Sequence, residues 1–377
     1  MSKKRSQKIR VEFRKNRENK ARQRQLDRRM LDDDDHAQDA VTEERMTGKG
    51  ALTRRRTVMA SADEASAGGT VLRDIDVSQC LSGLVLSPRG LGCHVRGDDG
   101  RNHECAVSRV VKTIASSERT AVVAGDRVLF RPAGDQQGFI ERVEPRRGIL
   151  SRKIRGQQHV LVANIDQLLI VASAADPPLK PSLVDRYLIS AAHGGVRPIL
   201  CINKVDLVDI VDLQPLAGLY AQLDCDVVLT STHTGYGLPR LRSFLHGKAT
   251  ALSGQSGVGK TSLLNSLQPG LGLKINEVAE DSRKGRHTTT HASLLELTFG
   301  GWVVDTPGIR QFELWDVQAD EVEGYFVEFR PFVAKCKFPD CSHTHEAGCA
   351  VKQAVDRRMI SRCRYESYLR IRSGEAD

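Results

Sequence analysis

Apolar and polar residues alternate in short segments over residues 75–148, and glycines separate these segments. Four examples are 82–86, 92–96, 126–130 and 138–143. About five such strands in roughly 70 residues are typical of a small β-barrel. A barrel of the OB type would bind nucleic acid on one face, whereas many other small barrels bind protein or nothing. The pattern therefore predicts the fold of this region but leaves its ligand open.

From about residue 158 the pattern changes, and buried strands alternate with amphipathic helices. The expected strands are 168–172, 196–202, 227–230, 249–252 and 302–304, and the expected helices are 181–192, 216–223, 238–245 and one that begins near Lys260. Strands that alternate with helices indicate a parallel sheet covered on both faces.

The composition is that of a soluble globular protein, with 40% apolar and 27% charged residues. The longest apolar stretch, Leu168–Ala175, is too short to cross a bilayer. The first 30 residues are polar and have no apolar core, so they do not resemble a secretory signal. We therefore expect a cytoplasmic monomer without a membrane partner. In a reducing compartment, clustered cysteines indicate a metal site rather than a disulfide framework.

The positive charge lies mainly in an N-terminal arm. Residues 1–30 contain 13 basic and three acidic residues, while the whole chain has a net charge of +9. Four aspartates at 32–35 and a Ser/Ala/Gly-rich stretch at 61–69 continue this low-complexity region, which predicts a disordered arm over residues 1–74. Such an arm would contact RNA phosphates, or it would be a solvated tail that only aids solubility.

A phosphate-binding motif occupies Gly254–Thr261, which matches G-x-x-x-x-G-K-[ST] between an expected strand and an expected helix. Its glycines allow backbone N–H groups to surround a β-phosphate at the helix N-terminus. Lys260 would neutralise β- and γ-phosphate oxygens, and the Thr261 hydroxyl would bind Mg²⁺. The alternative is a glycine-rich turn that matches by chance.

Three further matches at strand ends make that alternative improbable. Asn203–Asp206 (N-K-V-D) places a carboxylate where it can accept from guanine N1–H and the 2-amino group, a donor pair that adenine lacks. Asn203 would brace the phosphate loop, the stem of Lys204 would lie against the base, and the loop at Ser231 would read guanine O6. Asp305 in Asp305–Gly308 (D-T-P-G) would hold Mg²⁺ through water, and Gly308 would contact the γ-phosphate. The motifs together predict a GTP site.

The order of these motifs is permuted. The base motifs at 203 and 231 precede the phosphate loop at 254, whereas a standard GTPase has the phosphate loop first. The chain therefore looks circularly permuted, opened after Gly308. Predicted GTP-binding residues are Asn203, Lys204, Val205, Asp206, Ser231, Gly254, Gln255, Ser256, Gly257, Val258, Gly259, Lys260, Thr261, Ser262, Asp305 and Gly308.

The water-positioning group is not the usual one. Many GTPases have glutamine after the D-x-x-G glycine, and here that residue is Ile309. His287 is the candidate replacement, unless it is an ordinary loop residue, and one of Thr288, Thr289 and Thr290 would complete the Mg²⁺ shell. The predicted catalytic residues are Lys260, His287 and Thr289, and the magnesium ligands include Thr261 and Asp305.

A third constellation, Cys336-x4-Cys341-x-His343-x5-Cys349, supplies four ligands of the type that a closed structural zinc site needs. The alternative is a chance cluster of free thiols, and His345 is a competing ligand. Farther along, residues 354–372 predict one basic helix that carries Tyr365, Tyr368 and six arginines. This helix would contact RNA or present a solvated face.

The combination of these motifs with Gly285–Thr290 resembles the RsgA (YjeQ/YloQ) family over roughly residues 75–375. The resemblance implies a multidomain chain: an OB-type β-barrel (75–150), a circularly permuted α/β P-loop GTPase domain (151–316) and a small α-helical zinc-binding domain (317–377). It also implies GTP hydrolysis to GDP, stimulated by the small ribosomal subunit, and a role in late rRNA maturation. The arm and the sequence Ser231-Thr-His, in place of Ser-Ala-Lys, depart from the family pattern.

Two other functions remain open at this point. One is an RNA-binding module in which nucleotide binding is only regulatory, and the intact Lys260, Thr261 and Asp305 argue against it. The other is a sequence-specific DNA-binding zinc finger. It is disfavoured because no recognition helix lies between Cys336 and Cys349.

Overall fold

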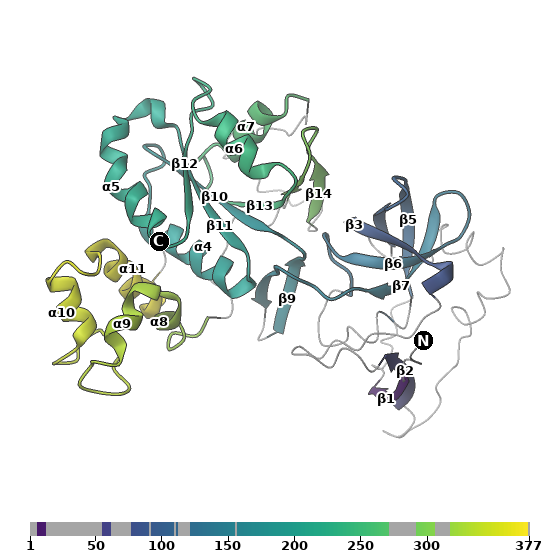
Figure 1. The fold of residues 1–377 in the computed structure, drawn as a ribbon, viewed down its shortest axis with the longest axis horizontal. Coiled ribbons are helices and arrows are strands. Elements are labelled where there is room, and N and C mark those ends of the chain that lie inside the picture. Colours follow the sequence, from purple (N-terminus) through teal and green to yellow (C-terminus); the bar gives the residue numbers. More distant parts are fainter. Residues whose placement is uncertain are drawn as a thin grey trace, which may run out of the picture. The chain divides into compact units, whose positions relative to one another are not determined.

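The structure is a computed structural model, and it describes residues 6–12, 55–61, 77–89, 92–108, 111, 121–154, 157–270, 292–305 and 317–375 (Figure 1). The chain forms two compact units: one holds residues 1–147, 157–164 and 291–294, and the other holds 148–156, 165–290 and 295–377. In the arm, β1 (Ser6–Glu12) pairs antiparallel with β2 (Arg55–Ser61). The rest of the arm lies outside the described residues, so its predicted disorder stays a prediction.

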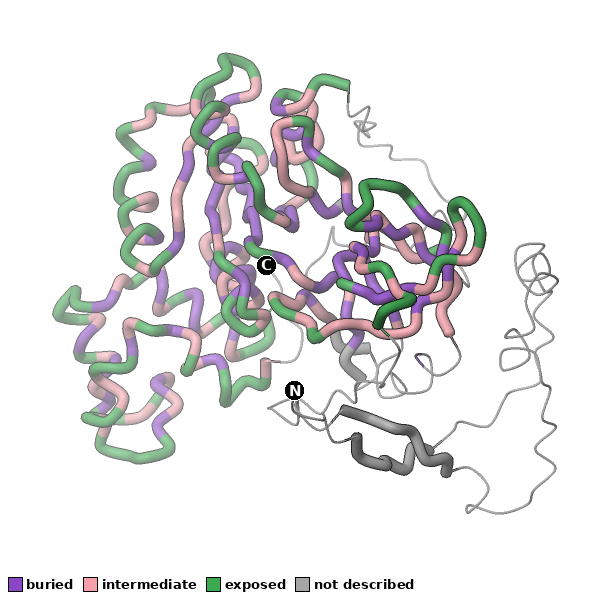
Figure 2. The backbone as a smooth tube through the Cα atoms, turned by 45° about the vertical axis from the view of Figure 1, so that its right-hand side comes forward, coloured by how far each residue is buried: buried purple, intermediate pink, exposed green. Residues whose placement is uncertain are grey.

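The first unit contains a closed five-stranded barrel in the order β3-β4-β5-β7-β6. Its strands are β3 (Leu81–Arg89), β4 (Gly92–Gly97), β5 (Asn102–Val107), β6 (Arg127–Pro132) and β7 (Gln137–Val143), preceded by the 3₁₀ turn η4 (Val77–Gln79). Buried and more exposed residues alternate along β3 and β4, and the buried interior includes Val85, Val95 and Phe130. Figure 2 colours the backbone by this burial. A Cβ at Gly83 would lie 2.6 Å from the Val95 side chain, so the close pairing of β3 with β4 at this position requires glycine. The predicted OB-type barrel is confirmed.

A six-stranded sheet forms the centre of the second unit, in the order β12-β11-β10-β13-β15-β14. The strands are β10 (Gln167–Ser173), β11 (Arg197–Asn203), β12 (Asp226–Leu229), β13 (Ala249–Ser253), β14 (Ser293–Glu296) and β15 (Trp302–Asp305), preceded along the chain by β8 (Leu150–Ile154) and β9 (Gln157–Val162). The pairs β10–β11, β10–β13, β11–β12 and β13–β15 are parallel. Every residue of β10 is buried, as expected for the central strand of a parallel sheet covered on both faces.

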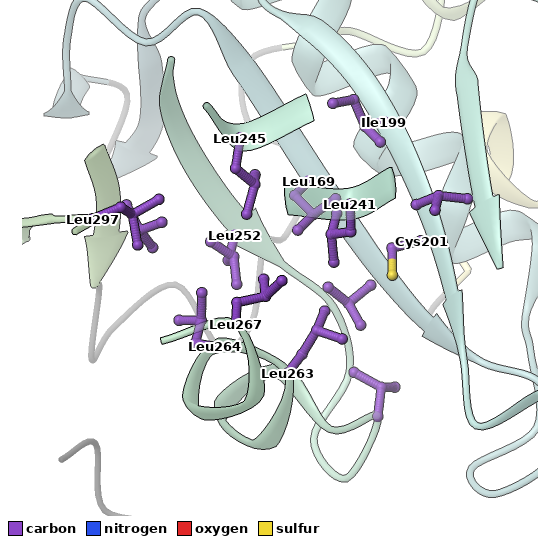
Figure 3. Packing of buried hydrophobic residues seen from close by; sticks show 14 residues of the cluster. Leu169, Ile199, Cys201, Leu241, Leu245, Leu252, Leu263, Leu264, Leu267 and Leu297 are labelled. Carbon is purple, nitrogen blue, oxygen red and sulfur yellow. The ribbon is translucent and has the colours of Figure 1, made fainter. Parts of the chain in front are cut away.

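Helices cover both faces of this sheet. One face packs against α6 (Leu238–Leu245) and α7 (Lys260–Leu267) through a leucine-rich cluster that includes Leu169, Leu241 and Leu263 (Figure 3). The other face carries α4 (Pro181–Gly194) and α5 (Ile210–Ala221) (Figure 1). The predicted start of α5 at 216 is wrong, because the Asp209 side chain caps the helix by accepting from Val211 N at 2.9 Å.

The C-terminal module belongs to the same unit. It comprises α8 (Val322–Tyr325), η6 (Val327–Phe329), α9 (Arg330–Val333), α10 (Ala350–Asp356) and α11 (Arg362–Ser373) around a core of Phe326, Phe329 and Tyr368. The single helix predicted over 354–372 is wrong, because Arg358 adopts a left-handed φ of 58° and ends the first helical segment. Nowhere in the described part of the chain is a helix long and apolar enough to cross a membrane.

Candidate nucleotide and metal sites

The predicted nucleotide motifs gather at one edge of the sheet. Asn203 ends β11, Ser231 follows β12, and Gly254 follows β13. Asp305 is the last residue of β15. Because these strands are parallel, their carboxyl ends lie together, which is where open α/β sheets bind ligands.

The phosphate loop between β13 and α7 depends on its glycines. Gly254, Gly257 and Gly259 all have positive φ, at 143°, 83° and 94°. A Cβ on Gly254 would lie 2.1 Å from Val171 O, and one on Gly259 would lie 2.5 Å from Asn203 Nδ2. Only glycine therefore allows the loop to adopt this conformation beside its neighbours.

Lys260 lies over the loop from the first turn of α7. Its Nζ donates to Gly254 O at 2.6 Å and to Gln255 O at 2.7 Å. The ammonium is thus held at the mouth of the loop, where a phosphate chain would meet it. Thr261 and Ser262 follow in the first turn and are partly exposed, as is Gln255, whereas Ser256 is exposed and Val258 is buried beneath the loop.

Asn203 connects the base motif to the phosphate loop. Its Nδ2 donates to Val258 O at 2.9 Å, and the side chain is fully buried. The hydroxyl of Thr230 donates to Asn203 Oδ1 at 3.1 Å, which fixes the orientation of the amide. Thr230 also contacts the Cys201 thiol at 3.2 Å, and burial raises the pKa of that thiol to about 12, so it stays protonated. The role of Thr230 was not predicted from the sequence, in which the only indication of it is a polar residue directly before Ser231.

The residues predicted to bind the base follow the ends of two neighbouring strands, Asp206 after β11 and Ser231 after β12. The buried Ser231 Oγ accepts from His233 N at 3.2 Å and from Thr234 N at 3.1 Å. A hydrogen bond from the Ser231 hydroxyl lowers the pKa of the exposed Asp206 carboxyl, and the nearby His233 and Lys204 lower it further. Asp206 is thus kept anionic, as an acceptor of two guanine donors must be.

Lys204 and Val205 shape the same turn. Lys204 has a left-handed φ of 62°, and its Nζ donates to Asp176 O at 2.5 Å, in the β10–α4 loop. Val205 is buried, and its N–H donates to Thr230 O at 3.2 Å. His287, Thr289 and Gly308 lie outside the described residues, as does the side chain of Asp305.

The four predicted metal ligands lie together in the C-terminal module. The ligand atoms of Cys336, Cys341, His343 and Cys349 all lie within 4.8 Å of one another. The Cys336 and Cys349 sulfurs are 3.9 Å apart, and His343 Nδ1 lies 3.5 and 3.3 Å from them. Tetrahedral bonds of about 2.3 Å to sulfur and about 2.0 Å to nitrogen would give separations of about 3.8 and about 3.5 Å. The side chains therefore fit a tetrahedral metal ion.

The surroundings of the thiols also suit a cation. Burial raises the pKa of the Cys341 thiol to about 12 and raises that of Cys349 as well. Without a cation these sulfurs would stay protonated, whereas a bound dication stabilises thiolates. His345, the competing ligand, is not in the cluster, and its Nδ1 lies 2.9 Å from Thr344 Oγ1.

Helix α11 holds the chain segment that carries the candidate metal ligands. The hydroxyl of Tyr365 donates to His343 O at 2.7 Å, and that of Tyr368 donates to Ser342 O at 2.8 Å. Arg364, on the same helix, is buried against Asp185 of α4. The expectation that this basic helix contacts RNA or solvent is therefore wrong for these three residues, whose side chains make contacts within the unit.

Along the chain the base motif at 203 precedes the phosphate loop at 254, yet in the sheet the two lie in contact through Asn203 and Val258. This arrangement defines a circularly permuted P-loop GTPase, here with a barrel before the nucleotide domain and a module that carries the Cys/His cluster after it. The model of the RsgA GTPase family matches residues 143–315. Relatives of that family are 38 and 39% identical over most of their own length, and the chain therefore belongs to the RsgA GTPase family.

Two relatives carry the same curated name, "Small ribosomal subunit biogenesis GTPase RsgA". The protein from Chlorobaculum tepidum is 39% identical over 78% of this chain and 97% of its own length. That from Ectopseudomonas mendocina is 38% identical over 82% of this chain and 88% of its own.

Two solved structures are also similar. The crystal structure of YjeQ from Thermotoga maritima has a TM-score of 0.66 and 33% identity, and covers 78% of this chain and 98% of its own. The crystal structure of YloQ, described as a circularly permuted GTPase, has a TM-score of 0.61 and 27% identity, and covers 80% of this chain and 97% of its own.

Proposed function

We propose that this protein binds GTP, hydrolyses it to GDP and phosphate, and assists the late maturation of the small ribosomal subunit. The observation that carries the nucleotide part is the hydrogen bond from Asn203 Nδ2 to Val258 O. It joins a guanine-recognition motif to a phosphate loop although 55 residues separate the two in the chain. The ribosomal part rests on the relatives, which are named for small-subunit biogenesis.

In this proposal each residue of the site has a separate task. Asp206 accepts from the guanine N1–H and amino groups, and the loop after Ser231 closes over the base. Lys260 neutralises charge on the β- and γ-phosphates, which grows on the transferred group in the transition state. Thr261 and Asp305 hold Mg²⁺, the first through its hydroxyl and the second through water. Gly308, His287 and Thr289 would complete the γ-phosphate end, with His287 orienting the attacking water.

We assign zinc to the cluster of Cys336, Cys341, His343 and Cys349. Three thiolates and one imidazole form a closed set that leaves no position for substrate, so the ion has a structural task. It would cross-link the segment from Cys336 to Cys349, in which the structure describes no helix or strand. We further place the protein in the cytoplasm as a monomer, where small ribosomal subunits and their rRNA are its partners.

The test measures GTP turnover by the full-length protein with and without purified small subunits. We expect slow turnover alone and a large stimulation by small subunits but not by large ones. If small subunits bind the protein without changing turnover, the alternative of an RNA-binding module with regulatory nucleotide binding is the better description. ATP in place of GTP is the matched control for the base site.

A further inference from the structure

His343 uses only one of its two ring nitrogens in the metal cluster. Its Nδ1 faces the Cys336 and Cys349 sulfurs, at 3.5 and 3.3 Å. Its Nε2 lies on the opposite side of the ring, 3.0 Å from Glu323 Oε2 in α8. The His343 side chain is 1% exposed and that of Glu323 is 27% exposed, so the carboxylate reaches a buried ring from the edge of the module.

A histidine that binds a metal through Nδ1 needs a hydrogen-bond acceptor at Nε2. A metal ion binds the lone pair of a neutral imidazole, so when Nδ1 is the ligand the ring proton must be on Nε2. That N–H is buried and needs an acceptor, because an unpaired buried donor costs about 1–3 kcal/mol. The rings of Phe329 and Tyr368 flank His343, with centroids 6.1 and 6.3 Å away, so its surroundings are otherwise largely apolar.

We propose that Glu323 is a positioning residue of the zinc site. In the structure Glu323 Oε2 lies 3.0 Å from Nε2 without the alignment of a hydrogen bond, so Nε2 has no aligned acceptor and the carboxylate must turn slightly to accept from Nε2–H. In that position it fixes the tautomer that presents Nδ1 to the metal and makes the imidazole a stronger ligand. This inference rests on the proposed assignment of zinc to the cluster. It adds a fifth residue, from helix α8, to the four ligands, which lie between α9 and α10.

The backbone of His343 is held separately from its ring. His343 has a left-handed φ of 57°, an uncommon conformation for a residue with a side chain, and costs of this kind are of order 1 kcal/mol. Its carbonyl accepts from the Tyr365 hydroxyl at 2.7 Å. Helix α11 thus fixes the backbone of the ligand and α8 orients the ring, so the two contributions can be separated by mutation.

The experiment compares zinc retention in the full-length wild-type protein, Glu323→Gln and the control Glu321→Gln. Glu321 is exposed and only two residues away, and its carboxylate accepts from Gln318 N rather than from a metal ligand. Zinc is transferred to the chromogenic chelator 4-(2-pyridylazo)resorcinol, and affinity is taken from the competition. We expect Glu323→Gln to bind zinc roughly 10–100-fold more weakly. Glu321→Gln should match the wild type, and Glu323→Asp should recover part of the loss.

A second measurement does not depend on the folding of a variant. In the wild-type zinc protein labelled with ¹⁵N-histidine, NMR should show His343 protonated at Nε2 and not at Nδ1, with slow solvent exchange. Wild-type zinc affinity in Glu323→Gln, or a rapidly exchanging Nε2 proton, would refute the role of Glu323 and leave the zinc assignment intact. A wild-type protein that contains no zinc would refute the metal assignment and this inference together.

Discussion

The Asp185 carboxylate lies 2.5 Å from the Arg364 guanidinium, and both side chains are almost completely buried between α4 and α11. Arg364 Nε also donates a hydrogen bond to Glu328 Oε1 at 2.7 Å. The Arg364 guanidinium carbon lies 4.3 Å from the centroid of the Phe326 ring. This pair joins the nucleotide-domain helix that follows the β10–α4 loop to the helix that supports the metal cluster. The two modules of the second unit are therefore held by a desolvated charge contact.

Removing one partner of this pair should destabilise the unit strongly. Asp185→Asn leaves Arg364 buried with only Glu328 to balance it, and the loss of one partner of a buried pair costs about 3–5 kcal/mol. We expect a decrease of about 3 kcal/mol in the free energy of unfolding, measured by urea denaturation followed by circular dichroism. The control Glu366→Gln breaks the exposed pair with Arg362 and should cost less than about 1 kcal/mol. Equal stabilities for the two variants would contradict the assigned importance of the buried pair.

Lys260→Ala should weaken GTP binding or turnover by roughly 10²-fold or more, because it removes the counter-charge of the β- and γ-phosphates. Affinity for a fluorescent GTP analogue and single-turnover hydrolysis measure the effect. Lys248→Ala is the control, since Lys248 is exposed and directly precedes β13, at the end of that strand away from the phosphate loop. A Lys260→Ala variant with wild-type affinity and turnover would remove the phosphate loop from the proposed site.

Asp206→Asn should lower the preference for GTP over ATP by roughly 10²-fold or more, because an amide cannot accept from both guanine donors. Competition between the two nucleotides measures the preference, and Asp212→Asn, on the exposed side of α5, is the control. Since the pKa of Asp206 lies below the ordinary aspartate value, the carboxylate stays charged as the pH falls. GTP selectivity of the wild type should therefore be flat from pH 8 to about pH 5. A decline with a midpoint within that range would argue against Asp206 as the base acceptor.

Cys341→Ser should release the metal and unfold the C-terminal module, since a structural metal contributes folding free energy directly. Metal content by mass spectrometry and resistance of residues 317–375 to limited proteolysis report the two effects. Cys363→Ser changes a cysteine of the same module outside the cluster and should leave both unchanged. Full zinc content in Cys341→Ser would show that Cys341 is not a ligand.

His287→Ala should bind GTP with wild-type affinity and lose the turnover stimulated by small subunits, by roughly 10²–10⁴-fold, if His287 orients the attacking water. Multiple-turnover assays with and without subunits measure this, and His291→Ala, four residues farther along the chain, is the control. Wild-type stimulation in His287→Ala would exclude His287 from the mechanism. The role would then pass to another polar group near the γ-phosphate.

The sequence alone determined the elements whose signal is local. The glycines of Gly254–Gly259 indicate a loop that only glycine can form, and the spacing from Cys336 to Cys349 brings four ligands within reach through a short stretch of chain. Strand and helix periodicity sufficed for the barrel and the parallel sheet, because burial on one or both faces imposes a regular pattern. The carboxyl ends of parallel strands then had to bring the nucleotide motifs to one edge, whatever their order in the chain.

Only the tertiary structure decided which polar residues serve these sites from a distance. Thr230, Glu323 and the pair of Asp185 with Arg364 act on partners 20 to 179 residues away in the chain, and no periodicity records such contacts. Arg364 looks like a solvated basic residue in sequence, because the same residue type serves a surface and a buried ion pair. Its burial depends on a carboxylate from another module, and that meeting is a property of packing rather than of local sequence.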